Sequence, residues 1–346
     1  MSNKEGTPHG ELRQDLVSDD WVVIASGRSK RPDAYAEKKR LPKPLPAYQD
    51  TCVFCNTIEF KEDPDILRLP DDPDTWQVRI FNNKFPAFHK KNEFRSWQVG
   101  PYRALEAVGY HELLAPRGHN KTDAAVTRAE MAMQLEALVL RYRQLAQEQS
   151  VNYIQIIKNY GEQAGASIEH PHHQIFTVPI LPNDVAKLLR GAESYAQKHK
   201  REVFADMLAY EKQEGTRIVY ENEHFTVFCP FASRVPFEMW VMPNQPGPFF
   251  EHIGPAQREA LSDAMCTVFQ RLYALLNDPP YNYYIHSAPC DDTGFVCDLS
   301  TFQHFRWHIE ILPRLSKFAG FELGTGIEIN TAIPEESAAF LRGHTG

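Results

Sequence analysis

The clearest pattern of hydrophobic positions begins near residue 130. Hydrophobic residues recur there at alternating intervals of four and three: Met131, Leu135, Leu138, Tyr142 and Leu145. This spacing places them on one face of an α-helix. Thr127 and Glu130 precede the stripe with the spacing of a capping box, in which two side chains bind the free N–H groups of the first turn. The pattern predicts a helix over Glu130–Leu145.

A second segment repeats the stripe later in the chain. The same spacing returns 130 positions after the first stripe: Leu261, Met265, Val268, Leu272 and Leu275. Gly254 and Pro255 mark its start, because proline is favoured in the first turn, where the missing N–H has no partner to lose. We therefore expect two similar helices.

Similar strands flank both predicted helices. His111–Pro116 precedes the first helix and Phe237–Pro243 the second, whereas Asn152–Ile156 and Asn282–His286 follow them. The order strand, helix, strand therefore occurs twice. This repeat predicts an α+β protein made of two tandem halves, each a mainly antiparallel sheet with packed helices.

The two halves can be aligned through a proline near the end of each. Matching Pro179 with Pro313 places His172 opposite Arg306, so only the first half keeps a histidine there. We assign residues 1–183 to a catalytic domain and 184–346 to linker helices followed by a degenerate domain. The linker is the charged, helix-like segment 184–215.

Length and charge narrow the classes of function. A chain of 346 residues fits two domains, and a net charge of -8 with a pI near 6.0 argues against nucleic acid as the main partner. The mean hydropathy of -0.45 and the polar N-terminus predict neither a signal peptide nor a membrane span. We expect a cytoplasmic protein that binds small molecules.

The segment Asn159–Gln174 carries the chemistry. Its small residues Gly161, Gly165 and Ala166 would let a phosphate approach backbone N–H groups, and the Ser167 hydroxyl would add a donor. The His170-Pro-His-His-Gln run that follows suggests a nucleophile, because strand alternation puts the first and third of these residues on one face. Taken alone, the run is also compatible with a metal cluster or a chance histidine-rich strand.

Cysteines suggest a metal rather than disulfides. Six cysteines in so long a chain make a disulfide scaffold improbable, and the pair Cys52-x-x-Cys55 has the spacing of a metal half-site. The alternative is that these two are ordinary thiols.

Several motifs in order resemble one family. They are the Cys-x-x-Cys pair, His119, the His170–Gln174 run, residues 27–32, residues 81–86 and the segment 307–322. Together they resemble the galactose-1-phosphate uridylyltransferase family of the histidine-triad superfamily over nearly the whole chain. The resemblance implies two histidine-triad-like halves.

By this resemblance His172 is the nucleophile and Gln174 a catalytic partner. His172 would take UMP from UDP-glucose and pass it to a hexose 1-phosphate such as galactose 1-phosphate, in a ping-pong mechanism. Gln174 favours transfer, since hydrolytic relatives carry histidine at that position. The alternatives are a phosphorylase or adenylyltransferase acting on ADP-glucose or a dinucleotide with the same nucleophile, and a non-catalytic nucleotide sensor.

The resemblance also implies a structural zinc held by Cys52, Cys55, His119 and His170. A second metal, iron in some members, would need three histidines and a glutamate in the second half. His286 and His308 stand at two of those positions, but Arg306 and Leu188 replace the other ligands. We therefore expect no second metal.

Further residues match substrate-binding positions of the family: Arg28, Arg31, Asn83, Asn159, Gly165, Ser167, Arg306, Lys317 and Phe318. The last two belong to a segment that reaches the hexose phosphate, often across a dimer interface. The resemblance therefore implies a homodimer. The alternative interpretation of any single lysine or arginine is that it is a solvated surface charge.

Overall fold

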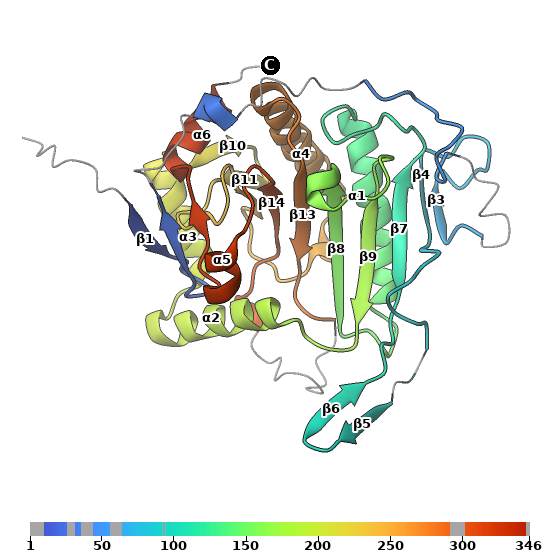
Figure 1. Ribbon diagram of the computed structural model, residues 1–346, viewed down its shortest axis with the longest axis horizontal. Helices are drawn as coiled ribbons and strands as arrows, with labels where there is room; N and C mark the ends of the chain where they lie inside the picture. The colour runs from blue at the N-terminus through green and yellow to red at the C-terminus, as the bar shows by residue number, and fades with distance from the viewer. Residues whose placement is uncertain are drawn as a thin grey trace, which may run out of the picture.

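A ten-stranded sheet forms the centre of the computed structural model (Figure 1), which describes residues 10–25, 32–35, 44–55, 64–91, 93, 95–290 and 302–343. Neighbouring strands are antiparallel throughout this sheet. In spatial order the strands are β10 (Ile218–Glu221), β11 (Phe225–Phe228), β12 (Met239–Pro243), β14 (His308–Pro313), β13 (Tyr281–His286), β8 (Tyr153–Tyr160), β9 (His173–Val178), β7 (His111–Pro116), β4 (Val78–Asn82) and β3 (Leu67–Leu69).

The strand order confirms the predicted duplication. Reading outward from the central pair, the first half supplies β8, β9, β7, β4 and β3, and the second supplies β13, β14, β12, β11 and β10. Helix α1 (Arg128–Leu145) connects β7 to β8, and α4 (Pro255–Leu276) connects β12 to β13. The two halves thus share one continuous sheet, joined where β8 pairs with β13, and the fold is α+β. The boundary at residue 183 stays a prediction.

The two long helices pack together behind the sheet (Figure 1). The capping box predicted for α1 is present: Glu130 N–H donates to the Thr127 hydroxyl, and Thr127 N–H donates to the Glu130 carboxylate. The hydrophobic stripe of each helix is buried, and both stripes belong to one core with the inner faces of β8 and β13. Burial of these stripes is the main force that fixes the helices.

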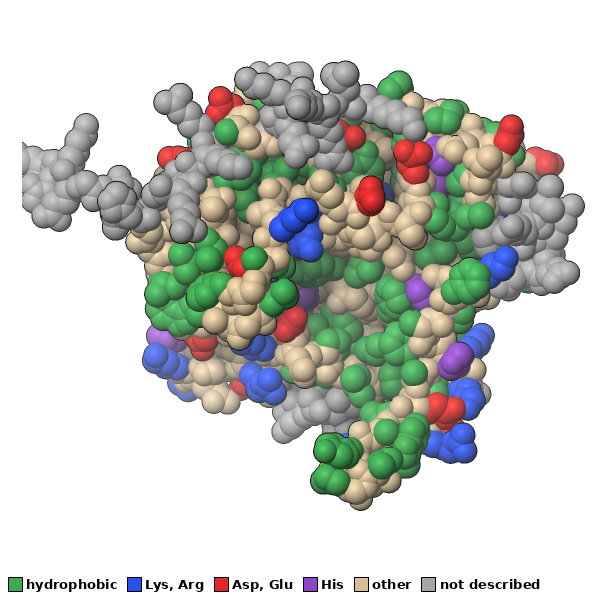
Figure 2. All heavy atoms as spheres, viewed as in Figure 1, with side chains coloured by type: hydrophobic (Ala, Val, Ile, Leu, Met, Phe, Trp, Pro, Cys, Tyr) green, Lys and Arg blue, Asp and Glu red, His purple; other side chains and the backbone are tan. Residues whose placement is uncertain are grey.

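The opposite face of the sheet is only partly covered. Helices α2 (Asn183–His199) and α3 (Val203–Glu214), the predicted linker, pack against second-half strands in a separate core. Short elements complete the molecule: β1 (Glu11–Gln14), β2 (Trp21–Ile24), β15 (Ile329–Asn330), α5 (Gly320–Thr325), α6 (Pro334–Arg342) and the hairpin β5 (Ser96–Val99) and β6 (Tyr102–Leu105). Figure 2 shows this face hollowed over the central strands.

The structure corrects the predicted alignment of the halves by two residues. The ring of His172 donates from Nδ1 to the carbonyl of His170, and the ring of His308 donates in the same way to the carbonyl of Arg306. His170 and Arg306 in turn bond the carbonyls of Pro116 and Pro243, which end β7 and β12. His172 therefore corresponds to His308, and His170 to Arg306. In the corrected alignment Pro313, the last residue of β14, corresponds to Thr177, so the two prolines are not equivalent positions.

No helix among the described ranges is long and apolar enough to cross a membrane.

Candidate active site and metal-binding group

His172 lies immediately before β9 and has one ring nitrogen available. Its Nδ1 donates to the backbone carbonyl of His170 at 2.9 Å, so Nδ1 carries the proton and Nε2 carries a lone pair. Nε2 has no hydrogen-bond partner among the described residues. Burial lowers the pKa of His172, and the Phe54 ring contacts the imidazole edge to face at 5.2 Å. A neutral, oriented imidazole of this kind can act as a nucleophile.

The small-residue loop lies between β8 and β9. Gly161 and Gly165 have φ values of 82° and 83°, which side chains other than glycine rarely adopt. The N–H groups of residues 164, 165 and 166 all donate to carbonyls within the loop. These three donors are therefore already used, in contrast to the expected backbone cradle. Asn159 is half-buried, and Ser167 is exposed.

Gln174 is held by a histidine on the neighbouring strand. The N–H of Ala87 donates to Nδ1 of His111, so the proton of this imidazole is on Nε2. His111 Nε2 donates to Gln174 Oε1 at 3.0 Å, which leaves the Gln174 NH₂ group without a partner among the described residues. Asn83 lies next to the same ring, with Nδ2 3.0 Å from Nε2. His173 faces the helices, where it contacts the Tyr283 hydroxyl.

The four predicted metal ligands converge in the structure. Their ligand atoms lie within 4.8 Å of one another. Cys55 Sγ is 3.5 Å from His119 Nδ1 and 3.4 Å from His170 Nδ1, and Cys52 Sγ is 3.7 Å from the latter. Zinc bonds of about 2.3 Å to sulfur and about 2.05 Å to nitrogen give a tetrahedral S···N separation of about 3.5 Å. The group therefore fits a tetrahedral metal ion.

A second feature of this group supports metal binding. His170 Nε2 donates to the carbonyl of Pro116 at 2.8 Å, so its Nδ1 is free to act as a ligand, as is usual for metal-bound histidines. Burial raises the pKa of the Cys55 thiol, and the adjacent Cys52 adds to this shift. A buried thiol beside a half-buried one favours a cation that stabilises their thiolates.

The second half contains a different arrangement at the corresponding place. Arg306 is buried and donates to Glu202 Oε2 at 3.0 Å and to the carbonyls of residues 243 and 244. Its guanidinium is therefore engaged within the second half. His286, His308 and Glu310 also lie close enough together to hold a metal. However, Glu310 already pairs with Arg234, which holds the pKa of this carboxyl well below its usual range despite burial.

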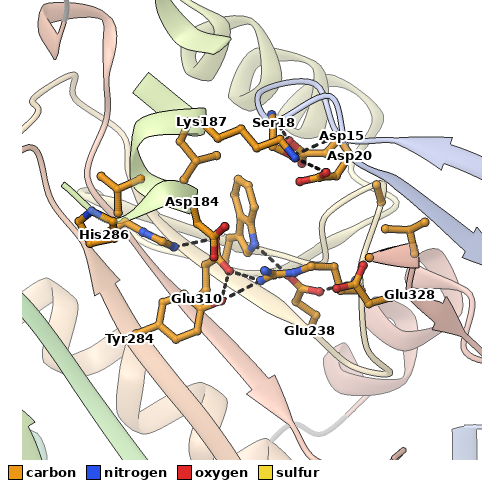
Figure 3. Close-up of a pocket in the computed structure, with 18 of the residues that line it drawn as sticks. Asp15, Ser18, Asp20, Asp184, Lys187, Glu238, Tyr284, His286, Glu310 and Glu328 are labelled. Atoms are coloured by element: carbon orange, nitrogen blue, oxygen red, sulfur yellow. Dashed lines mark hydrogen bonds and ion pairs between the residues drawn. The ribbon is translucent and has the colours of Figure 1, made fainter. Parts of the chain in front are cut away.

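Two cavities open on the partly covered face. A cavity of about 580 Å³ lies over the second-half strands, and its walls include six acidic residues: Asp15, Asp20, Asp184, Glu238, Glu310 and Glu328. Figure 3 shows several of these carboxylates around Lys187 and His286. Burial raises the pKa of Glu328, and the charges of Asp20 and Asp184 also raise it. An excess of negative charge makes this cavity unsuited to a nucleotide.

A cavity of about 300 Å³ lies next to the small-residue loop. It is lined by Asn159, Asn282, Arg314 and Phe318, among others. The Arg314 guanidinium stacks over the Phe318 ring at 5.4 Å, and Lys317 is exposed beside them. The cavity thus brings Asn159 and Phe318 together and adds an arginine suited to phosphate.

Two predicted residues are not described by the structure, and three residues near the site were not predicted from the sequence. Arg28 and Arg31 fall outside the described residues. Arg314, Asn282 and His111 were not predicted. Arg314 stands within a motif that resembles the family, whereas the other two could be found only from strand pairing.

The chain is similar to known proteins over nearly its whole length. Residues 3–182 match the family model described as galactose-1-phosphate uridyl transferase, N-terminal domain, and residues 109–340 match a domain of unknown function, DUF4921. An ADP-glucose phosphorylase of Arabidopsis thaliana is 32% identical over 336 residues, covering 96% of this chain and 92% of the relative. A galactose-1-phosphate uridylyltransferase of Thermotoga maritima is 27% identical over 342 residues, covering 96% and 98%.

Solved structures extend the similarity to the fold. The crystal structure of an ADP-glucose phosphorylase from Arabidopsis thaliana with bound ADP-glucose matches with a TM-score of 0.81 and 28% identity, covering 97% of this chain and 100% of that chain. A uridylyltransferase structure matches with a TM-score of 0.70 at 21% identity, covering 96% and 97%. This chain therefore belongs to the galactose-1-phosphate uridylyltransferase family and is a nucleotidyltransferase that acts on sugar phosphates, as its motifs predicted.

Proposed function

We propose that this protein moves a nucleotidyl group from a nucleoside diphosphate glucose to a phosphate-bearing acceptor through a covalent bond to His172. The observation that supports this best is the His172 ring itself. Its Nδ1 is fixed by the His170 carbonyl, and its Nε2 is free of partners in the described part of the chain. A sensor that only binds nucleotides would not need an oriented lone pair.

The two steps are chemically balanced. The lone pair of His172 Nε2 attacks the α-phosphorus, the bond from this phosphorus to the bridging oxygen breaks, and glucose 1-phosphate leaves with the electron pair. A phosphate oxygen of the acceptor then attacks the same phosphorus, and the P–N bond breaks to return the lone pair to Nε2. Gln174 donates from its free amide to a phosphate oxygen in both steps.

ADP-glucose with inorganic phosphate as acceptor is the first candidate pair of substrates. The ADP-glucose phosphorylase relative supports it, with higher identity than the uridylyltransferase of Thermotoga maritima. This order reverses the sequence-based preference. UDP-glucose with a hexose 1-phosphate is the second candidate, supported by that uridylyltransferase and by the family model over residues 3–182.

Donors labelled at the α-phosphate test both candidates. The protein is incubated with ADP-glucose or UDP-glucose without an acceptor, and bound label and released glucose 1-phosphate are measured. We expect about one label per active site, acid-labile, and an equal burst of glucose 1-phosphate. Adding phosphate or galactose 1-phosphate should then release the label as the matching product. Labelling by neither donor would contradict the proposal and favour a binding protein.

We also infer that Cys52, Cys55, His119 and His170 hold a structural zinc ion. Four protein ligands close the coordination shell, so the metal would supply rigidity rather than a bound water. It would fasten residues 52–55 to the chain two positions before the nucleophile. A homodimer and a cytoplasmic location remain predictions from the sequence.

A further inference from the structure

One contact between the halves reaches the candidate active site. Asn282 of β13 pairs directly with Asn159 of β8, at the seam between the two halves. The Asn282 side chain crosses this seam. Its Nδ2 donates to Asn159 Oδ1 at 2.8 Å and to the Ala164 carbonyl in the small-residue loop, also at 2.8 Å. A second-half residue therefore touches both the loop and a predicted substrate-binding residue.

These two bonds fix the direction of two amides. The Ala164 carbonyl can only accept, so the Asn282 atom that faces it must be the NH₂ group. The second hydrogen of that NH₂ group points to Asn159, so the Asn159 atom that meets it must be the carbonyl oxygen. The Asn159 NH₂ group consequently faces the other way, and it has no partner among the described residues. It lies on the wall of the cavity that Arg314 and Phe318 also line.

We propose that Asn282 is a positioning residue that keeps the NH₂ group of Asn159 turned toward the phosphates of the substrate. The inference rests on the proposed function. Without Asn282, the Asn159 amide could turn over and present its oxygen to a phosphate oxygen, which repels it. The same residue holds the loop between Asn159 and the nucleophile. The second half would thereby contribute a residue to the site in the first half.

The duplication supplies a matched control. In the corrected alignment Gln174 corresponds to Glu310, and their strand partners Ile157 and Tyr284 therefore correspond as well. Counting two positions back along both strands makes Gln155 of β8 the counterpart of Asn282. Gln155 also bonds across the seam, to the Ile285 carbonyl at 3.1 Å, but it faces the acidic cavity. Removing the Gln155 side chain takes away a similar contact across the seam, away from the small-residue loop.

The test compares Asn282→Ala, Asn159→Ala, the double variant and Gln155→Ala. The rate of nucleotidyl-enzyme formation is measured in single turnovers at saturating and limiting donor. We expect Asn282→Ala and Asn159→Ala each to slow this step on the order of tenfold to a hundredfold, as for a lost bond to a charged group. The double variant should be little slower than Asn159→Ala alone, because one residue acts through the other. Gln155→Ala should react like wild type.

A second substitution separates positioning from simple packing. Asn282→Asp has nearly the same shape but cannot donate at neutral pH, so it should turn the Asn159 amide over and slow the reaction more than Asn282→Ala does. Fully additive effects in the double variant, or equal losses in Asn282→Ala and Gln155→Ala, would overturn the positioning role. Absence of labelling in the wild type would instead overturn the proposed function, and this inference with it.

Discussion

The two halves of the molecule share one architecture but differ in the residues at one corner. His172 and His308 hold the same position and the same bond to a preceding carbonyl. The neighbouring positions have diverged: Gln174 corresponds to Glu310, and His170 to Arg306. The first half thus has a neutral amide where the second has a carboxylate, and a candidate metal ligand where the second has an arginine.

The change from amide to carboxylate reverses the electrostatics of the site. In the first half, the neutral Gln174 keeps its NH₂ group without a partner among the described residues. In the second half, Glu310 carries a negative charge, and the adjoining cavity contains further carboxylates (Figure 3). His308 is fully buried and stacks on Trp240 at 4.7 Å, whereas His172 keeps 6% of its surface exposed. The second-half histidine is therefore more deeply buried than His172 and lies beside a carboxylate instead of a neutral amide.

The change from histidine to arginine replaces one kind of cross-link with another. His170 contributes to the Cys₂His₂ group, while Arg306 joins Glu202 and the end of β12 directly through its guanidinium. His170 and Arg306 each bond the last residue of a corresponding strand. The second half joins this corner of the fold through an ion pair and backbone hydrogen bonds, without thiols.

Removing each of the two equivalent histidines should show the largest difference between the halves. His172→Gly is expected to slow transfer by at least about a thousandfold, since the nucleophile is lost. His308→Gly should leave transfer close to wild type, because its ring is buried away from the small-residue loop. Steady-state transfer and the labelling burst measure both. Near-normal transfer by His172→Gly would rule out the covalent mechanism. So would a wild-type protein that releases glucose 1-phosphate only when donor and acceptor are both bound.

Loss of a thiolate tests the metal cross-link. Cys55→Ser is expected to lose the metal and roughly 3 kcal/mol or more of stability, because binding of a structural ion contributes directly to folding. Elemental analysis should give about one zinc per wild-type chain and none in the variant, with thermal unfolding run in parallel. Active wild type free of zinc would refute the assignment. Two metals per chain, one of them lost in His308→Ala, would show that the second-half cluster also binds.

Placing the second-half glutamate at position 174 of the first half tests what the difference between amide and carboxylate does. Gln174→Glu places a carboxylate where the phosphates approach, and we expect nucleotidyl-enzyme formation to slow roughly 30- to 300-fold, about 2–3 kcal/mol. Gln155→Glu is the control, since it adds the same charge beside the acidic cavity. If both variants lose activity equally, the effect is one of net charge. If Gln174→Glu reacts normally, the amide does not contact the substrate.

Local patterns predicted much of this molecule, and contacts between distant segments account for the rest. The stripes of α1 and α4 and the capping box at Thr127 follow from residue type and spacing, whereas the full set of four candidate metal ligands came from the family resemblance. The pairing of Asn282 with Asn159 depends on strand register across the seam, which spacing cannot give. The alignment through Pro179 and Pro313 was wrong for a related reason. The residues that correspond in the two halves are identified by their hydrogen bonds to strand ends, which the sequence does not show.

The smallest expected effect concerns the ion pair of the second half. Glu202→Gln keeps the shape and a hydrogen-bond acceptor but removes the charge opposite Arg306, whose side chain is 3% exposed. A buried cation without a counter-charge is unfavourable, although the 21% exposure of Glu202 weakens the pair. We expect a loss of about 1–2 kcal/mol in urea unfolding, with zinc content and labelling unchanged. Replacing both residues, as Glu202→Leu with Arg306→Met, should recover much of that loss because no charge then remains buried. An unchanged free energy of unfolding in Glu202→Gln would mean that the backbone carbonyls alone hold Arg306, and that the second half needs no ionic cross-link.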